Sequence, residues 1–350
     1  MRCSTRATLL LLLAASFVPG LSLAADPPER PLLPYEPRAD TTVLRQQPYH
    51  AYFTLDAYGR RIDFYLSEEP PGAAPMPLVV YVHGSGCQSN FVEENGRLQG
   101  RNGHSTIADV LRGRARLVIV EKPGVKLLDA PPDPGGASRA SPAFRSEHTL
   151  ERWAEAVHAA LEAARKLPEI LPGRVLVAGH SEGGIVAARV AAADPSVTHV
   201  AILAGGGPTQ LFDLLTLARR GFLLQNVSKV PQERVDYALA QWREIQADPD
   251  SAEKLFLGHP YRRWSSFLKT STLEQLLKTD ARIYAAQGTD DQAVAWESFE
   301  VLRSELLSKG RRAEFDAVAG ADHSFVVHSE KPSDGWKELF ERVAAWFLKP

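Results

Sequence analysis

The chain has 350 residues, which is enough to bury a large core in one big domain with an insertion or in two smaller domains. Hydrophobic residues make up 44% and charged residues 23%, so the composition is that of an ordinary globular protein and excludes a mostly disordered chain. The formal net charge of −2 at pH 7 lacks the basic surplus that nucleic-acid binding requires, so no nucleic-acid partner is expected.

Residues 1–24 predict a secretory signal peptide. Arg2 and Arg6 form a positive start, residues 9–18 form an apolar run, and Ala24 ends a small-residue cleavage site. A membrane anchor is the competing interpretation, but the run is shorter than the roughly 20 residues that span a bilayer. We therefore expect an exported protein, in a bacterial periplasm or secreted to the medium, without a stable membrane anchor after cleavage.

The next two segments predict a lead-in and a hairpin. Residues 25–48 are rich in proline, which favours an extended, irregular stretch outside the core. Polar and apolar residues alternate over 49–70 on both sides of Ala57-Tyr58-Gly59, which is typical of an antiparallel hairpin.

Buried strands and helices then alternate along the chain. Unbroken apolar runs predict strands that are buried on both faces, and amphipathic or alanine-rich stretches between them predict helices. The predicted strands are 77–84, 115–124, 174–180, 197–207, 281–291 and 312–323, and the predicted helices are 151–167, 182–193, 295–310 and 335–348. Together with the hairpin, this order predicts an α/β fold with a doubly wound, mostly parallel eight-stranded sheet and an antiparallel N-terminal hairpin.

Residues 208–275 interrupt the alternation. They contain helix-like stretches and no convincing strand, although they lie between two buried strands. The favoured interpretation is an inserted helical cap, which divides the α/β core into residues 49–207 and 276–350. Within it, Arg262 and Arg263 could bind a substrate carboxylate, although adjacent arginines on a helix are usually solvated.

The motif Gly179-His180-Ser181-Glu182-Gly183 directly follows one predicted strand and opens a predicted helix. This is the context of a Gly-x-Ser-x-Gly nucleophile elbow, in which a sharp strand-to-helix turn exposes the serine and glycines on either side prevent clashes. A plain turn whose serine caps the helix is the alternative. The strand and helix on either side favour Ser181 as a nucleophile.

A nucleophilic serine needs a histidine base and a carboxylate that orients it, in the chain order serine, acid, histidine. Asp290 and Asp291 follow the strand predicted at 281–291, and His323 follows the strand predicted at 312–323. His328 is a weaker candidate for the base because it lies further from the strand end.

These motifs, in this order and context, resemble those of the α/β-hydrolase superfamily, and the resemblance covers nearly all of the chain from about residue 50 onward. Gly288-Thr289-Asp290-Asp291-Gln292-Ala293-Val294 matches the family's Gly-Thr-x-Asp-x-x-Val pattern, and Gly320-Ala321-Asp322-His323 matches its Gly-x-x-His ending. The resemblance implies a catalytic triad of Ser181, Asp291 and His323, with Asp291 preferred over Asp290.

Acyl transfer through a serine also needs backbone N–H groups that stabilise the developing oxyanion. One comes from the residue after the nucleophile, Glu182, and the other from the loop after the third strand, where His83-Gly84-Ser85-Gly86 lies. The family's His-Gly-x pattern implies Ser85 as that donor, with Gly86 as the fallback. The Glu182 side chain could contact substrate or a base partner, or could be anchored to the cap or to the flank of the sheet.

The sequence predicts an exported serine hydrolase that cleaves carboxylic esters through an acyl-enzyme, with a small-molecule or peptide substrate. The alternatives are a serine peptidase with the same triad, acyl transfer to an alcohol, and a hydrolase-like fold used only for binding. Neither a metal-binding motif nor a phosphate-binding loop is present, so no cofactor or metal is expected. The cap and loops carry no readable motif, so the sequence does not predict the substrate.

Overall fold

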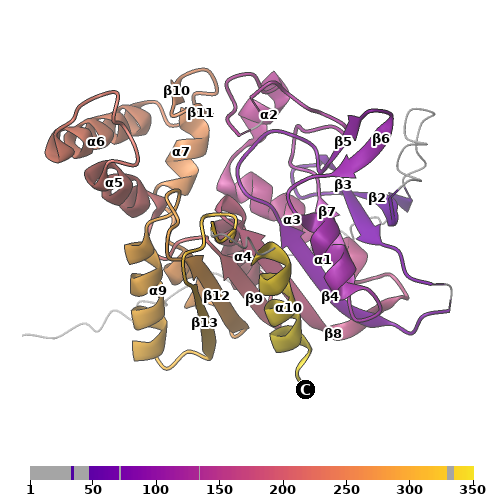
Figure 1. The fold of residues 1–350 in the computed structure, drawn as a ribbon. Coiled ribbons are helices and arrows are strands. Elements are labelled where there is room, and N and C mark those ends of the chain that lie inside the picture. Colours follow the sequence, from indigo (N-terminus) through magenta and orange to yellow (C-terminus); the bar gives the residue numbers. More distant parts are fainter. Residues whose placement is uncertain (1–32, 35–46, 71, 134, 329–334) are drawn as a thin grey trace, which may run out of the picture.

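A computed structural model describes residues 33–34, 47–70, 72–133, 135–328 and 335–350 (Figure 1). The predicted signal peptide and most of the predicted lead-in lie outside the described residues.

A single large sheet forms the centre of the molecule (Figure 1), and in the described ranges it has nine strands. Their order across the sheet is β1-β2-β3-β7-β4-β8-β9-β12-β13. The pairs from β1 to β7 are antiparallel, and all pairs from β7 to β13 are parallel. The strands are β1 (Leu33–Pro34), β2 (Tyr49–Leu55), β3 (Arg61–Ser67), β4 (Met76–Val82), β7 (Arg116–Val120), β8 (Ile170–His180), β9 (His199–Leu203), β12 (Arg282–Gly288) and β13 (Ala313–Val318).

Helices cover both faces of this sheet, as a doubly wound fold requires. One hydrophobic core packs α3 (Leu150–Ala164), α4 (Glu182–Ala193) and α9 (Trp296–Ser308) against one face. A second core packs α1 (His104–Leu111) and α10 (Gly335–Leu348) against the other. The small side chains of α4 let it lie close to the sheet, which holds its first residue at the end of β8. The predicted α/β fold with a mostly parallel sheet and an N-terminal hairpin is therefore confirmed.

The sheet has one strand more than the eight predicted. The additional strand, β1, consists of two residues on the outer edge of the hairpin, paired with Tyr52 and Phe53 of β2. Two residues are too few to show an alternating pattern, and Pro34 is tolerated there because an edge strand has one side without ladder partners.

The connections between β4 and α3 hold further elements that have no strong pattern in the sequence. They are the small hairpin of β5 (Phe91–Glu94) and β6 (Arg97–Gly100), and the helices α1 and α2 (Pro142–Glu147). These elements are short and expose part of their length, so their apolar residues are too few to produce a clear period.

Residues 208–275, the predicted cap, hold α5 (Gln210–Arg220), α6 (Pro231–Ala247) and α7 (Tyr261–Phe267), and α8 (Thr272–Leu276) begins within them. We call this stretch the cap segment. It has a hydrophobic core of its own, which includes Leu214, Ile245 and Trp264. It also contains a two-residue antiparallel pair, β10 (Leu255–Phe256) with β11 (His259–Pro260), so the expectation that it lacks strands was wrong in this detail.

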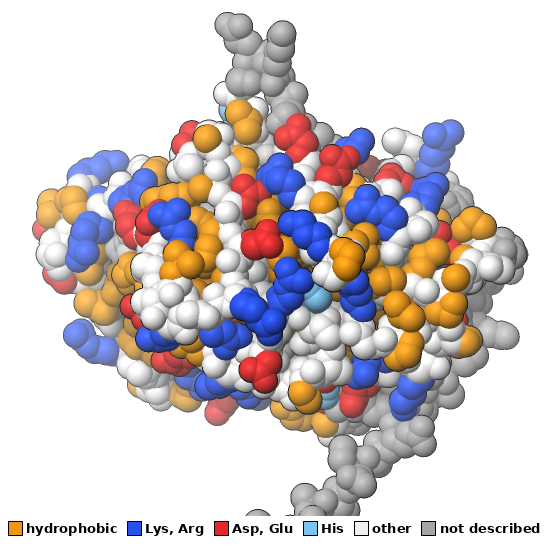
Figure 2. Space-filling model, turned by 90° about the horizontal axis from the view of Figure 1, so that it is seen from below, with side chains coloured by type: hydrophobic (Ala, Val, Ile, Leu, Met, Phe, Trp, Pro, Cys, Tyr) orange, Lys and Arg blue, Asp and Glu red, His pale blue; other side chains and the backbone are white. Residues whose placement is uncertain are grey.

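Figure 2 shows the molecule from below, at the end away from α5 and α6. Lys and Arg side chains gather near the middle of this face, with Asp, Glu and hydrophobic side chains among them. Within the described ranges, none of the helices is both long and apolar enough to cross a membrane.

Candidate active site

Ser181 lies at a sharp turn between β8 and α4, as the motif predicts. Its backbone has φ 56° and ψ −125°, a conformation that residues other than glycine rarely adopt. The turn is tight enough that a Cβ on Gly179 would overlap the carbonyl group of Gly183, and a Cβ on Gly183 would overlap the carbonyl oxygen of Val82. These two glycines are therefore required for the serine to occupy this position.

Replacing Gly183 by alanine is expected to lower the free energy of unfolding by about 3 kcal/mol or more, because neither β4 nor α4 can move away without losing core packing. Gly135→Ala is the matched control, since a Cβ at this position meets open space and the Gly135 backbone does not have the positive φ that would strain an alanine. Urea unfolding followed by circular dichroism measures both. Equal stability of the two variants would contradict the close packing at the turn.

His323 and Asp291 are in direct contact. His323 follows β13 and Asp291 follows β12, and the His323 Nδ1 atom lies 2.8 Å from Asp291 Oδ2. The Asp291 side chain is fully buried and accepts three more hydrogen bonds, from the Gln287 side chain and from the backbone N–H groups of Ala293 and Val294. These bonds fix the carboxylate, so Nδ1 of His323 carries the proton and Nε2 faces away from the acid.

The two alternative residues lie elsewhere. Asp290 is exposed, and its carboxylate accepts a hydrogen bond from the Thr289 hydroxyl at 3.2 Å. His328 is exposed and pairs with Asp322 at a distance of 2.7 Å between His328 Nε2 and Asp322 Oδ2. The structure therefore brings Asp291 and His323 together and leaves Asp290 and His328 apart from them.

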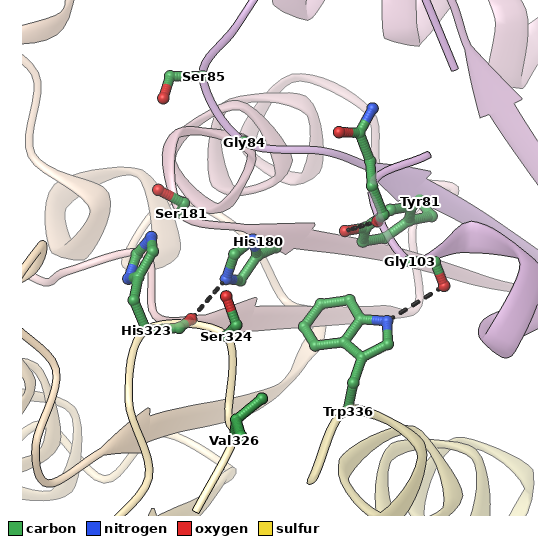
Figure 3. Close-up of a pocket in the computed structure, with 11 residues that line it drawn as sticks. Tyr81, Gly84, Ser85, Gly103, His180, Ser181, His323, Ser324, Val326 and Trp336 are labelled. Carbon is green, nitrogen blue, oxygen red and sulfur yellow. Dashed lines mark hydrogen bonds between the residues drawn. The ribbon is translucent and has the colours of Figure 1, made fainter. Parts of the chain in front are cut away.

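Two cavities meet at Ser181. Both are lined by Ser85, Ser181 and His323. One, of about 460 Å³, continues past Tyr81 and Trp336, and Figure 3 shows Ser181 on its wall between Ser85 and His323. The other, of about 320 Å³, continues beneath the cap segment, and we call it the cap cavity. Its apolar lining includes Ile185, Leu214, Leu217, Leu223, Leu257, Trp264 and Val294.

Within the described residues, Ser181 Oγ forms no hydrogen bond to His323. A catalytic serine and histidine often draw together only when substrate binds, so this separation is compatible with a nucleophile and its base. What the structure provides is a shared wall, since Ser181 and His323 line the same two cavities.

Two backbone N–H groups lie beside Ser181. Gly84 is so close that a Cβ on it would lie 3.1 Å from the Cβ of Ser181, which places the Gly84–Ser85 peptide next to Ser181. Glu182 is the first residue of α4, where N–H groups have no intrahelical acceptor. In the described part of the chain, neither the Ser85 nor the Glu182 N–H donates to a protein acceptor. Both are therefore available to a ligand oxygen.

The Glu182 side chain points into the protein and is 2% exposed. Its Oε1 accepts hydrogen bonds from Lys122 Nζ at 3.0 Å and His148 Nε2 at 2.9 Å, and its Oε2 accepts from Arg263 Nη2 at 2.8 Å. Burial alone would raise the pKa of this carboxyl, but the charges of Lys122, His148 and Arg263 outweigh burial and hold the pKa well below its ordinary value. Glu182 is thus a buried carboxylate anchored to the cap segment.

This cluster corrects the expectation that Arg263 is solvated. Arg263 is 2% exposed and bound to Glu182, whereas Arg262 is the more exposed of the two. The sequence also gave no prediction for Lys122 or His148. One signal for the burial of Lys122 was available. Lys122 closely follows the fully buried strand β7 with no turn residue between them, and it lies at the edge of the sheet where Ser181 lies.

His180, the residue before Ser181, supports the loop that carries His323. Its Nε2 lies 2.9 Å from the His323 carbonyl oxygen (Figure 3), and the two rings are 4.9 Å apart. Burial, and next the charge of His323, lower the pKa of His180 to about 4, so His180 is neutral at pH 7 and donates this hydrogen bond.

Comparison with known proteins agrees with this architecture. Residues 79–338 match the family model of the alpha/beta hydrolase family. None of the curated proteins matches the chain. Among solved structures, Est1E from Butyrivibrio proteoclasticus is similar, with a TM-score of 0.53, 16% identity, and coverage of 85% of this chain and 97% of Est1E.

Two peptidases are similar over part of their length. Acylaminoacyl peptidase from Pyrococcus horikoshii has a TM-score of 0.56 at 11% identity, over 89% of this chain and 44% of the peptidase. A puromycin-hydrolyzing peptidase from Mycobacterium tuberculosis has a TM-score of 0.53 at 15% identity, over 86% and 39%. At these identities the likeness concerns the fold. The family match, which spans most of the sequence and agrees with the sheet order, shows that this chain belongs to the α/β-hydrolase family.

Proposed function

We propose that this protein is an exported serine hydrolase that cleaves carboxylic esters through an acyl-enzyme. The observation that carries the proposal is the contact of 2.8 Å between His323 Nδ1 and Asp291 Oδ2, on a cavity wall shared with Ser181. A histidine held in this tautomer can take the proton from a serine hydroxyl with its Nε2 atom.

In the proposed reaction, His323 Nε2 accepts the Ser181 proton while Oγ attacks the ester carbonyl carbon. The oxygen of the tetrahedral intermediate becomes negative and accepts hydrogen bonds from the Ser85 and Glu182 N–H groups. His323 then gives the proton to the leaving alkoxide, and an acyl group remains on Ser181. Water, deprotonated by His323, attacks the acyl group. The bond between Ser181 Oγ and the acyl carbon then breaks, His323 returns the proton to Oγ, and the acid leaves.

Esters are preferred over peptides with a free amino terminus because the two carboxylates that line the cap cavity, those of Glu182 and Asp213, already bind other groups of the protein. A terminal ammonium is bound best by an ionised carboxylate whose charge is not already neutralised by other groups. Both oxygens of Glu182 are bound to Lys122, His148 and Arg263, and those of Asp213 accept from the Ala295 N–H and the Ser298 hydroxyl. In addition, burial raises the pKa of Asp213 to about 7, which weakens its attraction for a cation.

A fluorophosphonate probe tests the proposal, because it labels only an activated serine. The wild-type protein is expected to be labelled and Ser181→Ala is not, and a panel of p-nitrophenyl esters, aminoacyl amides and thioesters then assigns the bond cleaved. Cleavage of amides without esters would favour a peptidase. An unlabelled wild type that binds but does not convert these compounds would overturn the enzymatic proposal. Export is tested separately, by fractionating the cells that produce the full chain.

A further inference from the structure

A group of buried charges lies behind the proposed oxyanion-binding N–H groups. Lys122 Nζ donates to the Gly84 carbonyl oxygen at 2.7 Å, to the Gly86 carbonyl oxygen at 3.2 Å and to Glu182 Oε1 at 3.0 Å. The Lys122 side chain is 1% exposed and lines neither of the two cavities at Ser181. Lys122 is therefore close to the reaction site and yet unable to touch a ligand there.

We propose that Lys122, held in place by Glu182, is a positioning residue that orients the Gly84–Ser85 peptide of the oxyanion hole. The proposal rests on the proposed function. In a trans peptide the C=O and N–H bonds point in opposite directions. A cation that binds the Gly84 carbonyl oxygen therefore fixes the direction of the Ser85 N–H, the group proposed to bind the oxyanion.

The same contact makes the Ser85 N–H a stronger donor. A positive charge at the carbonyl oxygen withdraws electrons from the peptide, and hydrogen bonds strengthen one another in this way in a buried site. His83 Nδ1 also lies 3.1 Å from the Gly84 oxygen. Burial, then the neighbouring charge of Lys122, keeps the pKa of His83 well below its ordinary value, so Lys122 supplies the charge in this contact.

Glu182 connects the two halves of the hole. Its backbone N–H is the second proposed oxyanion donor. Its carboxylate binds the Lys122 ammonium, which in turn orients the Ser85 N–H, the first proposed donor. The other carboxylate oxygen accepts from Arg263 of α7, so the cap segment holds this carboxylate from the opposite side. A buried lysine is costly to desolvate, and stability alone gives no reason to prefer it over an apolar side chain here. Orientation of the loop provides that reason.

Lys122→Met tests the proposal, because methionine keeps the side-chain volume and leaves Glu182 paired with Arg263 and His148. We expect kcat for a p-nitrophenyl ester to fall about 10- to 100-fold with KM within about threefold of wild type, somewhat less than the loss of a whole oxyanion donor. The inhibition constant of a trifluoromethyl ketone, which binds as an oxyanion adduct of the serine, should rise by the same factor. The inhibition constant of the matching methyl ketone, the control without the fluorine atoms, should not change.

Arg116→Met is the matched control, because Arg116 is a buried cation at the other end of the same strand, where its Nε donates to the Ser67 carbonyl oxygen at 2.8 Å. This variant should lose stability without any change in kcat or in the trifluoromethyl ketone constant. Lys122→Gln, which retains one donor, is expected to lie between Lys122→Met and wild type, and it gives the same readout if Lys122→Met fails to fold.

The outcomes separate this proposal from the proposed function. A wild-type protein that neither hydrolyses esters nor reacts with the fluorophosphonate contradicts the proposed function, whatever Lys122 does. If the wild type is active and the Lys122 variants bind the trifluoromethyl ketone as tightly as the wild type, the positioning role is contradicted and the proposed function is not.

Discussion

Replacing His323 by alanine is expected to lower kcat for a p-nitrophenyl ester by about 10⁵- to 10⁶-fold, with little change in KM. The variant leaves Ser181 and the two proposed oxyanion donors in place but removes the group proposed to take the serine proton. Initial rates over a range of substrate concentrations give both constants, and circular dichroism checks that the variant is folded.

His328→Ala is the matched control for this variant. His328 is five residues further along the chain, is exposed, and pairs with Asp322 rather than with Asp291. Its removal should leave kcat within about twofold of wild type, as for other exposed residues outside the site. A large loss of activity in His328→Ala together with a near-normal His323→Ala would exchange the roles of the two histidines.

The sequence was sufficient to predict the elements that position Ser181, Asp291 and His323. Buried parallel strands have nearly continuous apolar runs, so β4, β7, β8, β9 and β12 were recognisable, and each of the three residues follows the end of such a strand or of β13. The contact between Asp291 and His323 then follows from topology, because β12 and β13 are neighbouring parallel strands that end at the same edge.

The charge cluster around Glu182 was beyond prediction for a physical reason. Considered separately, Lys122, His148 and Arg263 favour solvent, and a lysine or arginine is rarely buried without a partner. Burial is tolerated here because the three meet one carboxylate, and they come from the end of β7, the end of α2 and the middle of α7. That meeting depends on how the cap segment packs on the core, which the chain order does not specify.

Asp291→Asn is expected to lower kcat by about 10⁴-fold while leaving the fold intact, because the amide forces the wrong tautomer on His323. The backbone N–H groups of Ala293 and Val294 both donate to Oδ1 of Asp291, so the asparagine oxygen must occupy that position. Its NH₂ group then takes the place of Oδ2 and donates to His323 Nδ1. His323 would carry its proton on Nε2, where it cannot accept one from Ser181.

Asp290→Asn is the matched control for this substitution, since it changes the same chemical group one residue earlier in the chain. The Asp290 carboxylate is exposed and is bound by the Thr289 hydroxyl rather than by His323, so kcat is expected to stay within about twofold of wild type. Stopped-flow measurement of the p-nitrophenol burst separates acylation from deacylation in each variant. Both steps should be slow in Asp291→Asn because His323 is proposed to serve as the base in both. A loss of activity confined to Asp290→Asn would contradict the proposal that Asp291, which contacts the imidazole in the structure, is the orienting carboxylate.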